Sequence, residues 1–549
     1  MTTRRYALAC VAVVACASQR SAAQQVRPYR PAFDVLDYAI AIDLPDTGAA
    51  IHANALLSVA RTGKSDTLVL DLLDLTVNSV TVDGRAVKFA RRPATIDIPL
   101  PRKGDRATYQ VAVDYGGVVT DGLIAHSDSA GRWTYFGDNW PNRARHWIPS
   151  IDHPSDKATV TWRVTTLPTR TVIANGKLVS TRAVRSSSGA DRTETVWRET
   201  RPIPPYLMVI AAAPLTVYDL GETACGLAET QRCVPQAVYT APEQHAFAPG
   251  PFARANEIVQ LFARLVGPFP YEKLDHLQSS TRFGGMENAS AIFYADNGFR
   301  RSPGMRDNIV AHETAHQWFG DAVTEREWPH VWLSEGFATY FATLWTRAAR
   351  GDTAFRADLA NVRRTVLADT ISVTRRPVID TIETDLLALL NRNSYEKGGF
   401  VLHMLRTEVG ERAFFDAIRA YYTKHRHGTA LTDDLRAEME RESKQPLGWF
   451  FDQWLRRPGY PEVTAQWSYD ATTHEVVVGV TQATRFGAFE FPITVAAIDS
   501  SGVAHRKVVR MPAIAGKSQE LRIPVPAKPA AVVLDPDVEL LARFTVVPR

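Results

Sequence analysis

Two histidines spaced four residues apart could hold a metal ion. His312 and His316 stand in the segment His-Glu-Thr-Ala-His, and on a helix residues i and i+4 share one face, so both imidazoles can reach one cation. Glu313 lies about 100° round such a helix from His312. It can face a water molecule beside the metal without being a ligand, and can accept a proton from that water as a general base.

A catalytic zinc ion needs a third protein ligand and one open position. Glu335 follows His316 by 19 residues and lies at the start of the next stretch with helical apolar spacing. Two helices joined by a connection of this length can pack side by side, so we expect Glu335 to complete a site for one Zn²⁺ per chain. The alternative is that His312 and His316 are only buried polar residues, and the added glutamate argues against it.

Two further segments accompany the metal motif, and together they resemble a known family. They are Phe283-Gly284-Gly285-Met286-Glu287-Asn288 before His312 and Asn393-Ser394-Tyr395-Glu396-Lys397-Gly398-Gly399 after Glu335. In this order the motifs resemble those of the gluzincin zinc aminopeptidases, peptidase family M1, over about residues 33–465. The resemblance implies a thermolysin-like catalytic domain. It also implies a short form without the large C-terminal helical domain of many relatives, because the chain ends soon after the small β region that follows position 461.

The resemblance implies a role for each matched residue. Glu287 would bind the α-amine of a peptide with a free N-terminus, a charge-assisted contact that a blocked peptide cannot make. Gly284 and Gly285 would let backbone groups approach the substrate closely. Met286 belongs to the same substrate-binding segment, where it is expected mainly to shape the turn. Tyr395 would donate its hydroxyl to the oxyanion of the tetrahedral intermediate.

One position departs from the family pattern. Members usually carry a second amine-binding Gln or Glu before an Arg-x-x-x-Pro segment, which here is 145–149, and counting back places Trp140 at that position. Tryptophan supplies neither a carboxylate nor an amide oxygen. The aromatic-rich run 133–147 is interpreted first as domain packing. The alternatives are that Asp138 or Asn139 replaces the anchor, or that Trp140 shapes the first subsite.

The spacing of apolar residues divides the remaining chain into regions. From about 33 to 235 it alternates with period two, as in the segment 158–164. From about 240 to 457 it follows helical spacing, and helices are expected at 308–319, 333–349 and 413–425. Asp307 or Asn308 would cap the first of these. Short strands resume after a Pro- and Gly-containing linker at 457–461.

These regions predict a multidomain α+β fold. An N-terminal β-rich saddle domain would span 24–237, a mainly helical catalytic domain 238–460, and a small C-terminal β-sandwich 461–549.

The N-terminus has the pattern of a secretory signal. Arg4 and Arg5 precede an apolar stretch that ends at Ala17, and a small-residue site follows, so cleavage after Ala23 would remove residues 1–23. The minority alternative is a lipid anchor on Cys16. In an exported protein, periplasmic or secreted, the remaining pair Cys225 and Cys233 is expected to form a disulfide.

Charge and hydropathy limit the partners. The net charge of the whole chain is +4, and removing the signal with its three arginines leaves about +1, too little to attract nucleic acid. No internal segment has the 18 uninterrupted apolar residues of a membrane span, and nothing in the sequence predicts an oligomeric state. We therefore expect an exported zinc aminopeptidase acting on peptides with a free N-terminus. The alternative is a zinc endopeptidase or loosely selective peptidase on the same scaffold.

Overall fold

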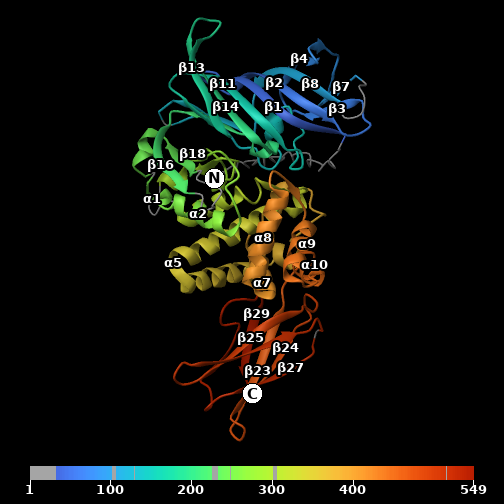
Figure 1. The fold of residues 1–549 in the computed structure, drawn as a ribbon, viewed down its shortest axis with the longest axis vertical. Helices are drawn as coiled ribbons and strands as arrows, with labels where there is room; N and C mark the ends of the chain where they lie inside the picture. Colours follow the sequence, from blue (N-terminus) through green and yellow to red (C-terminus); the bar gives the residue numbers. More distant parts are fainter. Residues whose placement is uncertain are drawn as a thin grey trace, which may run out of the picture.

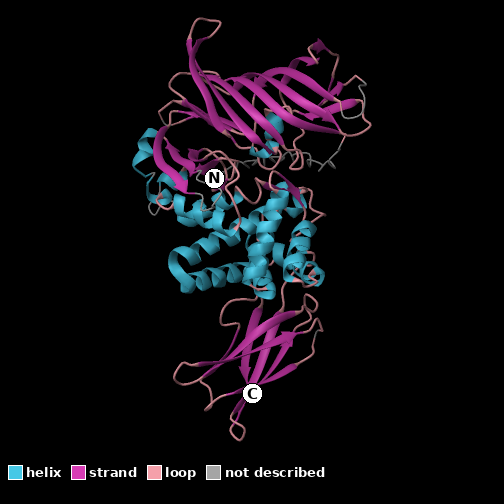
Figure 2. Cartoon of the chain, in the orientation of Figure 1, coloured by secondary structure: helices cyan, strands magenta, loops and turns pink. Residues whose placement is uncertain are grey.

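A computed structural model describes residues 32–101, 107–128, 130–224, 233–247, 249–300, 306–514 and 516–549. Figure 1 shows a β region, a mainly helical region and a second β region stacked along the long axis of the molecule. Figure 2 shows the helices concentrated between the two groups of strands. The expected signal segment 1–23, with Cys16, and Cys225 lie outside the described residues, so the disulfide stays a prediction.

The first region is built on an eight-stranded sheet. In spatial order its strands are β13 (Lys177–Arg185), β14 (Asp191–Ile203), β11 (Ala158–Thr166), β1 (Phe33–Asp43), β2 (Ala50–Arg61), β8 (Thr108–Val118), β4 (Thr76–Val82) and β5 (Arg85–Ala86). In β11 the apolar residues of the predicted alternation are buried and the polar residues between them are more exposed. This one-sided burial is what the period-two pattern predicts.

Two smaller sheets complete the first region. One contains β12 (Thr171–Ala174), β15 (Ile210–Ala213), β10 (Trp133–Gly137) and β9 (Leu123–Ser127). The other contains β3 (Thr67–Asp71), β7 (Thr95–Pro99) and β6 (Ala90–Arg91). The turn that follows β10 carries Trp140 towards the helical region.

A five-stranded sheet joins the strands on either side of the first long helix. Its order is β16 (Thr216–Ala224), β17 (Cys233–Thr240), β18 (Leu274–Ser279), β20 (Ala291–Ala295) and β19 (Gly285–Met286). The expected boundary at 237/238 therefore falls inside β17, which pairs with β16 on one side and with β18 on the other. Period-two alternation identifies a strand but not the sheet it joins, so the sequence did not show that these two strands belong to the sheet of β18.

The helical region contains the predicted helices with shifted ends. Its helices are α1 (Pro249–Phe252), α2 (Ala255–Leu265), α3 (Asn297–Arg300), α4 (Asp307–His316), α5 (Trp332–Ala368), α6 (Ser372–Arg375), α7 (Gly398–Val409), α8 (Glu411–His425), α9 (Thr432–Ser443) and α10 (Gly448–Leu455). A short parallel pair of strands, β21 (Val323–Glu325) and β22 (Gly428–Ala430), connects the loop after α4 to the segment before α9.

Two details of these helices differ from the sequence-based expectation. Neither Asp307 nor Asn308 caps α4, because the N-cap is Arg306 and makes no side-chain cap bond. The Asp307 carboxylate instead accepts hydrogen bonds from Trp345 and Arg350 of α5. The second difference is the length of α5, which continues past the expected end through a non-helical residue, Gly351, with φ 83°.

The C-terminal region contains two sheets. The first contains β27 (Gln519–Pro524), β24 (Glu475–Gln482), β23 (Glu462–Asp470) and β29 (Arg543–Pro548), and the second contains β26 (Ala504–Met511), β25 (Phe491–Ile498) and β28 (Ala531–Leu534). Gln453 of α10 donates to the backbone oxygen of Glu490 at 2.7 Å, which joins this region to the helices. The predicted α+β fold class, with β, helical and β parts in that order, is confirmed.

Among the described residues, no helix combines the length and apolar composition needed to cross a bilayer.

Candidate active site

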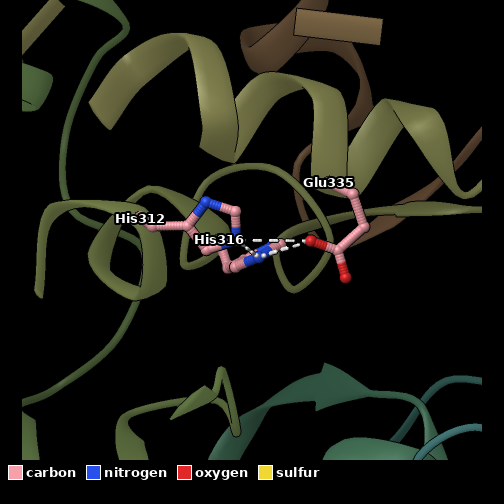
Figure 3. A group of neighbouring side chains, drawn as sticks. All are labelled: His312, His316 and Glu335. Atoms are coloured by element: carbon pink, nitrogen blue, oxygen red, sulfur yellow. Dashed lines mark hydrogen bonds and ion pairs between the residues drawn. The ribbon is translucent and has the colours of Figure 1, made fainter. Parts of the chain in front are cut away.

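The three expected metal ligands meet in the structure. His312 and His316 project from α4 and Glu335 from the first turn of α5, and Figure 3 shows both imidazoles directed at the Glu335 carboxylate. The two Nε2 atoms lie 3.2 Å apart, and each lies 3.3 Å from Oε2 of Glu335. The three atoms form a nearly equilateral triangle.

This triangle has the size that a tetrahedral zinc ion requires. Zinc binds imidazole nitrogen and carboxylate oxygen at about 2.0–2.2 Å, which separates ligand atoms by about 3.3–3.5 Å. Oε2 of Glu335 is buried and accepts no hydrogen bond from the described part of the chain. Two nitrogens and one oxygen at these separations fit a catalytic zinc site with one position left for water or substrate.

Neighbouring groups orient two of these ligands. Nδ1 of His316 lies 2.9 Å from the Ser334 hydroxyl and 3.2 Å from the backbone oxygen of Phe319. With Nε2 turned towards a metal, Nδ1 carries the proton and donates to these oxygens. The Tyr395 hydroxyl donates to Oε1 of Glu335 at 2.8 Å, which leaves Oε2 of that carboxylate facing the histidines.

A close approach of two backbones brings Tyr395 to the metal ligands. A Cβ atom on Gly336, next to Glu335 in α5, would lie 3.0 Å from the backbone carbon of Gly398. The first turn of α5 can therefore pack directly against the start of α7. The π-helical turn Asn393–Lys397 precedes α7 and carries Tyr395, whose ring stacks against His312 at 6.0 Å between centroids.

Glu313 lies beside the triangle. Its side chain is buried, and one of its oxygens lies close to Glu287 and His316, with the three potential ligand atoms within 4.8 Å of one another. A Cβ atom on Gly285 would lie 2.1 Å from Oε1 of Glu313. Gly285 therefore makes room for the Glu313 carboxylate, whereas a Cβ on Gly284 would contact nothing within 4 Å.

Glu287 follows β19 at the edge of the five-stranded sheet. Its carboxylate is buried near His316, and its backbone oxygen accepts a hydrogen bond from Nε2 of Gln317 at 2.8 Å. Oε1 of Gln317 accepts from the backbone nitrogen of Ser290 at 2.8 Å. Gln317 thus fixes both ends of the turn that presents Glu287. In the sequence, the only indication of this role for Gln317 was its position directly after His316.

Three buried carboxylates make the site strongly acidic. Burial raises the pKa of Glu287 to about 7 and that of Glu313 to about 8. Burial opposes ionisation of Glu335 too, but His316 and His312 outweigh it and lower its pKa. A cation held by the triangle would lower the pKa of all three carboxyl groups by Coulomb attraction. The electrostatics of the site therefore favour binding of a divalent cation.

Trp140 lies on the wall of the same cavity. Its ring makes edge contacts with Phe283 at 6.1 Å and Trp328 at 5.4 Å. Its two neighbours are engaged elsewhere. Asn139 donates to the backbone oxygen of Met208 and accepts from Trp147, and Asp138 pairs with Arg143 and Arg282. Neither offers a free group to a substrate amine.

The cavity has a volume of about 460 Å³. One part of its wall is the substrate-binding segment expected from the sequence, and residues from both sides of Gly351 in α5 form another part. The members of this segment that line the cavity are Phe283, Gly284, Gly285, Met286 and Glu287, and Trp140 contacts Phe283 on the same wall. All the expected catalytic, metal-ligating and substrate-binding residues line this one cavity.

Sequence reasoning missed a buried lysine that joins the first β region to the loop after α4. Lys157 directly precedes β11, and its ammonium donates to the backbone oxygens of Asp321 at 2.8 Å and Gly428 at 3.0 Å. Burial lowers its pKa to about 7. Lysine is usually exposed, so nothing in the sequence indicated this contact.

Comparisons with known proteins agree with the motifs. The model of the peptidase M1 N-terminal domain matches residues 36–207, and the model of the peptidase family M1 domain matches residues 253–454. Aminopeptidase N of Lactococcus lactis subsp. lactis is 26% identical, over 74% of this chain and 50% of its own length. Leucine aminopeptidase 2 of Yarrowia lipolytica is 27% identical, over 70% of this chain and 59% of its own length. The chain thus spans only about half the length of these relatives.

Solved structures share the fold. An M1 zinc metallopeptidase from Deinococcus radiodurans superposes with a TM-score of 0.67 at 24% identity, over 77% of this chain and 93% of that one. Legionella pneumophila aminopeptidase A, in complex with aspartic acid, gives a TM-score of 0.79 at 17% identity, over 95% of this chain and 61% of that one. With both domain models in family order, the chain belongs to peptidase family M1.

Proposed function

We propose that the chain is an exported zinc aminopeptidase that releases N-terminal residues from peptides. The observation that carries the proposal is the place of Glu287, a buried carboxylate whose oxygen lies within 4.8 Å of a ligand atom of His316. A substrate ammonium bound there would hold the first peptide bond at the metal triangle. The relatives named above as aminopeptidases support the same activity.

The proposed reaction uses the metal triangle and Glu313. A zinc ion held by His312, His316 and Glu335 would supply Lewis acidity that polarises the scissile carbonyl and acidifies water. The Glu313 carboxylate accepts the proton of the attacking water and passes it to the nitrogen of the leaving peptide. Its burial strengthens this exchange because solvent does not compete for the proton.

Two other groups orient and stabilise the substrate. Glu287 binds the α-ammonium group, which places the first carbonyl rather than a later one at the site of attack. The Tyr395 hydroxyl, now donating to Oε1 of Glu335, can turn to donate to the oxyanion. The first contact involves a full charge on the ammonium group, and the second involves the charge that develops on the oxyanion. Both lie in a buried cavity, where electrostatic interactions are stronger than in water.

A zinc endopeptidase is the second candidate, and Trp140 favours it. The position expected to supply a second amine-binding group carries an indole, and Asp138 and Asn139 are bound to other residues. Among the described residues, amine recognition therefore rests mainly on Glu287. If that single carboxylate selects weakly, peptides without a free N-terminus would also be cleaved.

A panel of chromogenic aminoacyl substrates tests the proposed activity. We expect hydrolysis that a chelator abolishes and added zinc restores. Glu287→Ala should strongly reduce cleavage of free-amine substrates. Equal activity of the wild-type enzyme on N-acetylated peptides would instead favour the endopeptidase.

Export is a separate part of the proposal and rests on residues 1–23. Arg4, Arg5 and the apolar stretch after them support cleavage after Ala23. N-terminal sequencing of the mature protein from the native host should begin at Gln24. A lipid-modified N-terminus at Cys16 would show an anchored form, and an intact N-terminus in the cytoplasm would contradict export.

A further inference from the structure

The cavity continues beyond the catalytic residues along α5. Thr343 lines it and lies eight residues after Glu335 on the same helix, which corresponds to about 12 Å along the helix axis. Helix α5 breaks at Gly351, and Figure 1 shows it as two arms. The second arm returns residues to the same wall, among them Asp358, Asn361 and Thr365.

The part of the cavity along α5 has room for the peptide beyond the cleaved bond. Glu287 would fix the α-amine, which is separated by one carbon atom from the scissile carbonyl. The first residue would then lie near Trp140 and Met286. The remaining peptide would run away from Glu287, along α5. An extended peptide advances about 3.3 Å per residue, so its third and fourth residues lie about 7 and 10 Å beyond the first, at a length that can reach the wall lined by Thr343 and Asp358.

The charges along this wall are unbalanced. No lysine or arginine is among the described residues that line the cavity. Glu396 lines it too, but forms an ion pair with Arg392. Asp358 is half-buried and has no hydrogen bond or ion pair within the described parts of the chain. Beyond Glu335, the other polar residues of α5 that line the cavity are Thr339, Thr343, Asn361 and Thr365. All four are uncharged, so Asp358 carries the unneutralised charge of this wall.

We propose that Asp358 selects peptides with a lysine or arginine at the third or fourth position from the N-terminus. The proposal rests on the proposed function, because it takes the direction of the substrate from Glu287. The long side chain of a lysine or arginine can reach from the peptide backbone to the Asp358 carboxylate, while its alkyl part contacts Val362 on the same wall. A glutamate at that position would meet Asp358 and be disfavoured.

A peptide series tests this selection. Amidated pentapeptides with an N-terminal leucine carry lysine, norleucine or glutamate at the third or fourth position and alanine elsewhere. We expect kcat/KM to fall from lysine to norleucine to glutamate by about threefold at each step, the size typical of a partly solvated ion pair. Raising the salt concentration should compress the series.

Variants of Asp358 assign the effect to this residue. Asp358→Asn should bring the lysine-to-glutamate ratio close to one, and Asp358→Lys should invert it. Asp352→Asn is the matched control, because it removes the same charge from the same arm at an exposed residue outside the cavity and should keep the wild-type ratio. Equal rates for the three peptides, or an unchanged ratio in Asp358→Asn, would overturn the proposal.

Measurements of peptide binding distinguish the proposed role of Asp358 from the proposed aminopeptidase activity. Calorimetry with the Glu313→Gln variant gives dissociation constants for the same peptides without turnover, and these should follow the same order. Hydrolysis of a leucine anilide, which has no third residue, reports the proposed function alone. Anilide turnover without peptide selectivity would reject the role of Asp358 only. Ordered binding without any turnover would reject the aminopeptidase instead.

Discussion

The metal side and the amine side of the cavity are held in different ways. On the metal side, three ligand atoms from two helices lie 3.2 to 3.3 Å apart, and Ser334 and Tyr395 bind the outer atoms of two ligands. On the amine side, Glu287 stands in a turn held by Gln317, and Trp140 lines the same cavity.

This difference shows that the amine side of the active site can change while the metal side is kept. Helix geometry fixes the spacing of His312 and His316, so a change there removes the metal site entirely. The amine side combines a turn of the catalytic region with a turn of the first β region. A change at Trp140 should alter recognition of the substrate and leave the metal ligands in place, so the two sides should respond differently to mutation.

Removing a metal ligand should have the largest effect. His316→Ala leaves two ligands, so we expect zinc to be lost and activity to fall at least about a thousandfold. Metal analysis and turnover of a leucine anilide measure both. His425→Ala in α8 is the control, because that histidine lies outside the cavity. Full activity of His316→Ala would contradict the metal assignment.

Removing the base should separate catalysis from metal binding. Glu313→Gln keeps the shape of the side chain but cannot accept a proton, so we expect kcat to fall by about 10²–10⁴ while zinc is retained. Metal content, kcat and KM are measured on the same preparation. Near-normal turnover would reject Glu313 as the base.

The hydroxyl of Tyr395 should matter less than the base. Tyr395→Phe removes one donor to the oxyanion, and we expect kcat to fall by about 10²–10³ with KM little changed. Because the hydroxyl also binds Glu335, zinc content must be measured as well. A rise in KM with kcat unchanged would show that Tyr395 binds substrate rather than stabilising the oxyanion.

Supplying the missing amine anchor should have the smallest effect. Trp140→Gln places an amide oxygen on the wall of the cavity that Glu287 also lines, and we expect KM for free-amine peptides to fall about threefold to tenfold, as for a hydrogen bond to a charged group. Trp140→Leu is the control, because it shortens the side chain without adding an acceptor. The same gain in both variants would trace the effect to space rather than to the amide.

The metal side could be predicted from the sequence because its geometry is local. Spacing of four residues places His312 and His316 together in any α-helix, and the motif of Glu335 identified the third ligand. The second arm of α5 could not be predicted, since its path depends on the break at Gly351. Nor could the sheet of β16 and β17, because pairing with β18 joins strands far apart in the sequence.

The roles of polar residues whose partners are distant in the sequence were the hardest to predict from the sequence. Asn139 and Asp138 are polar and close in sequence to the missing anchor, but their hydrogen bonds and ion pairs engage them elsewhere. The sequence contained no sign of these partners. Lys157 was missed for the opposite reason, because a lysine is expected at the surface and here binds backbone oxygens inside.

One comparison of products tests whether metal and amine recognition work together. The zinc-loaded enzyme is incubated with a pentapeptide and with its N-acetylated twin, and the fragments are identified by mass spectrometry over time. We predict stepwise release of single residues from the free peptide and an intact acetylated peptide. Internal fragments, or equal cleavage of both peptides, would contradict the assignment of Glu287 and the aminopeptidase activity.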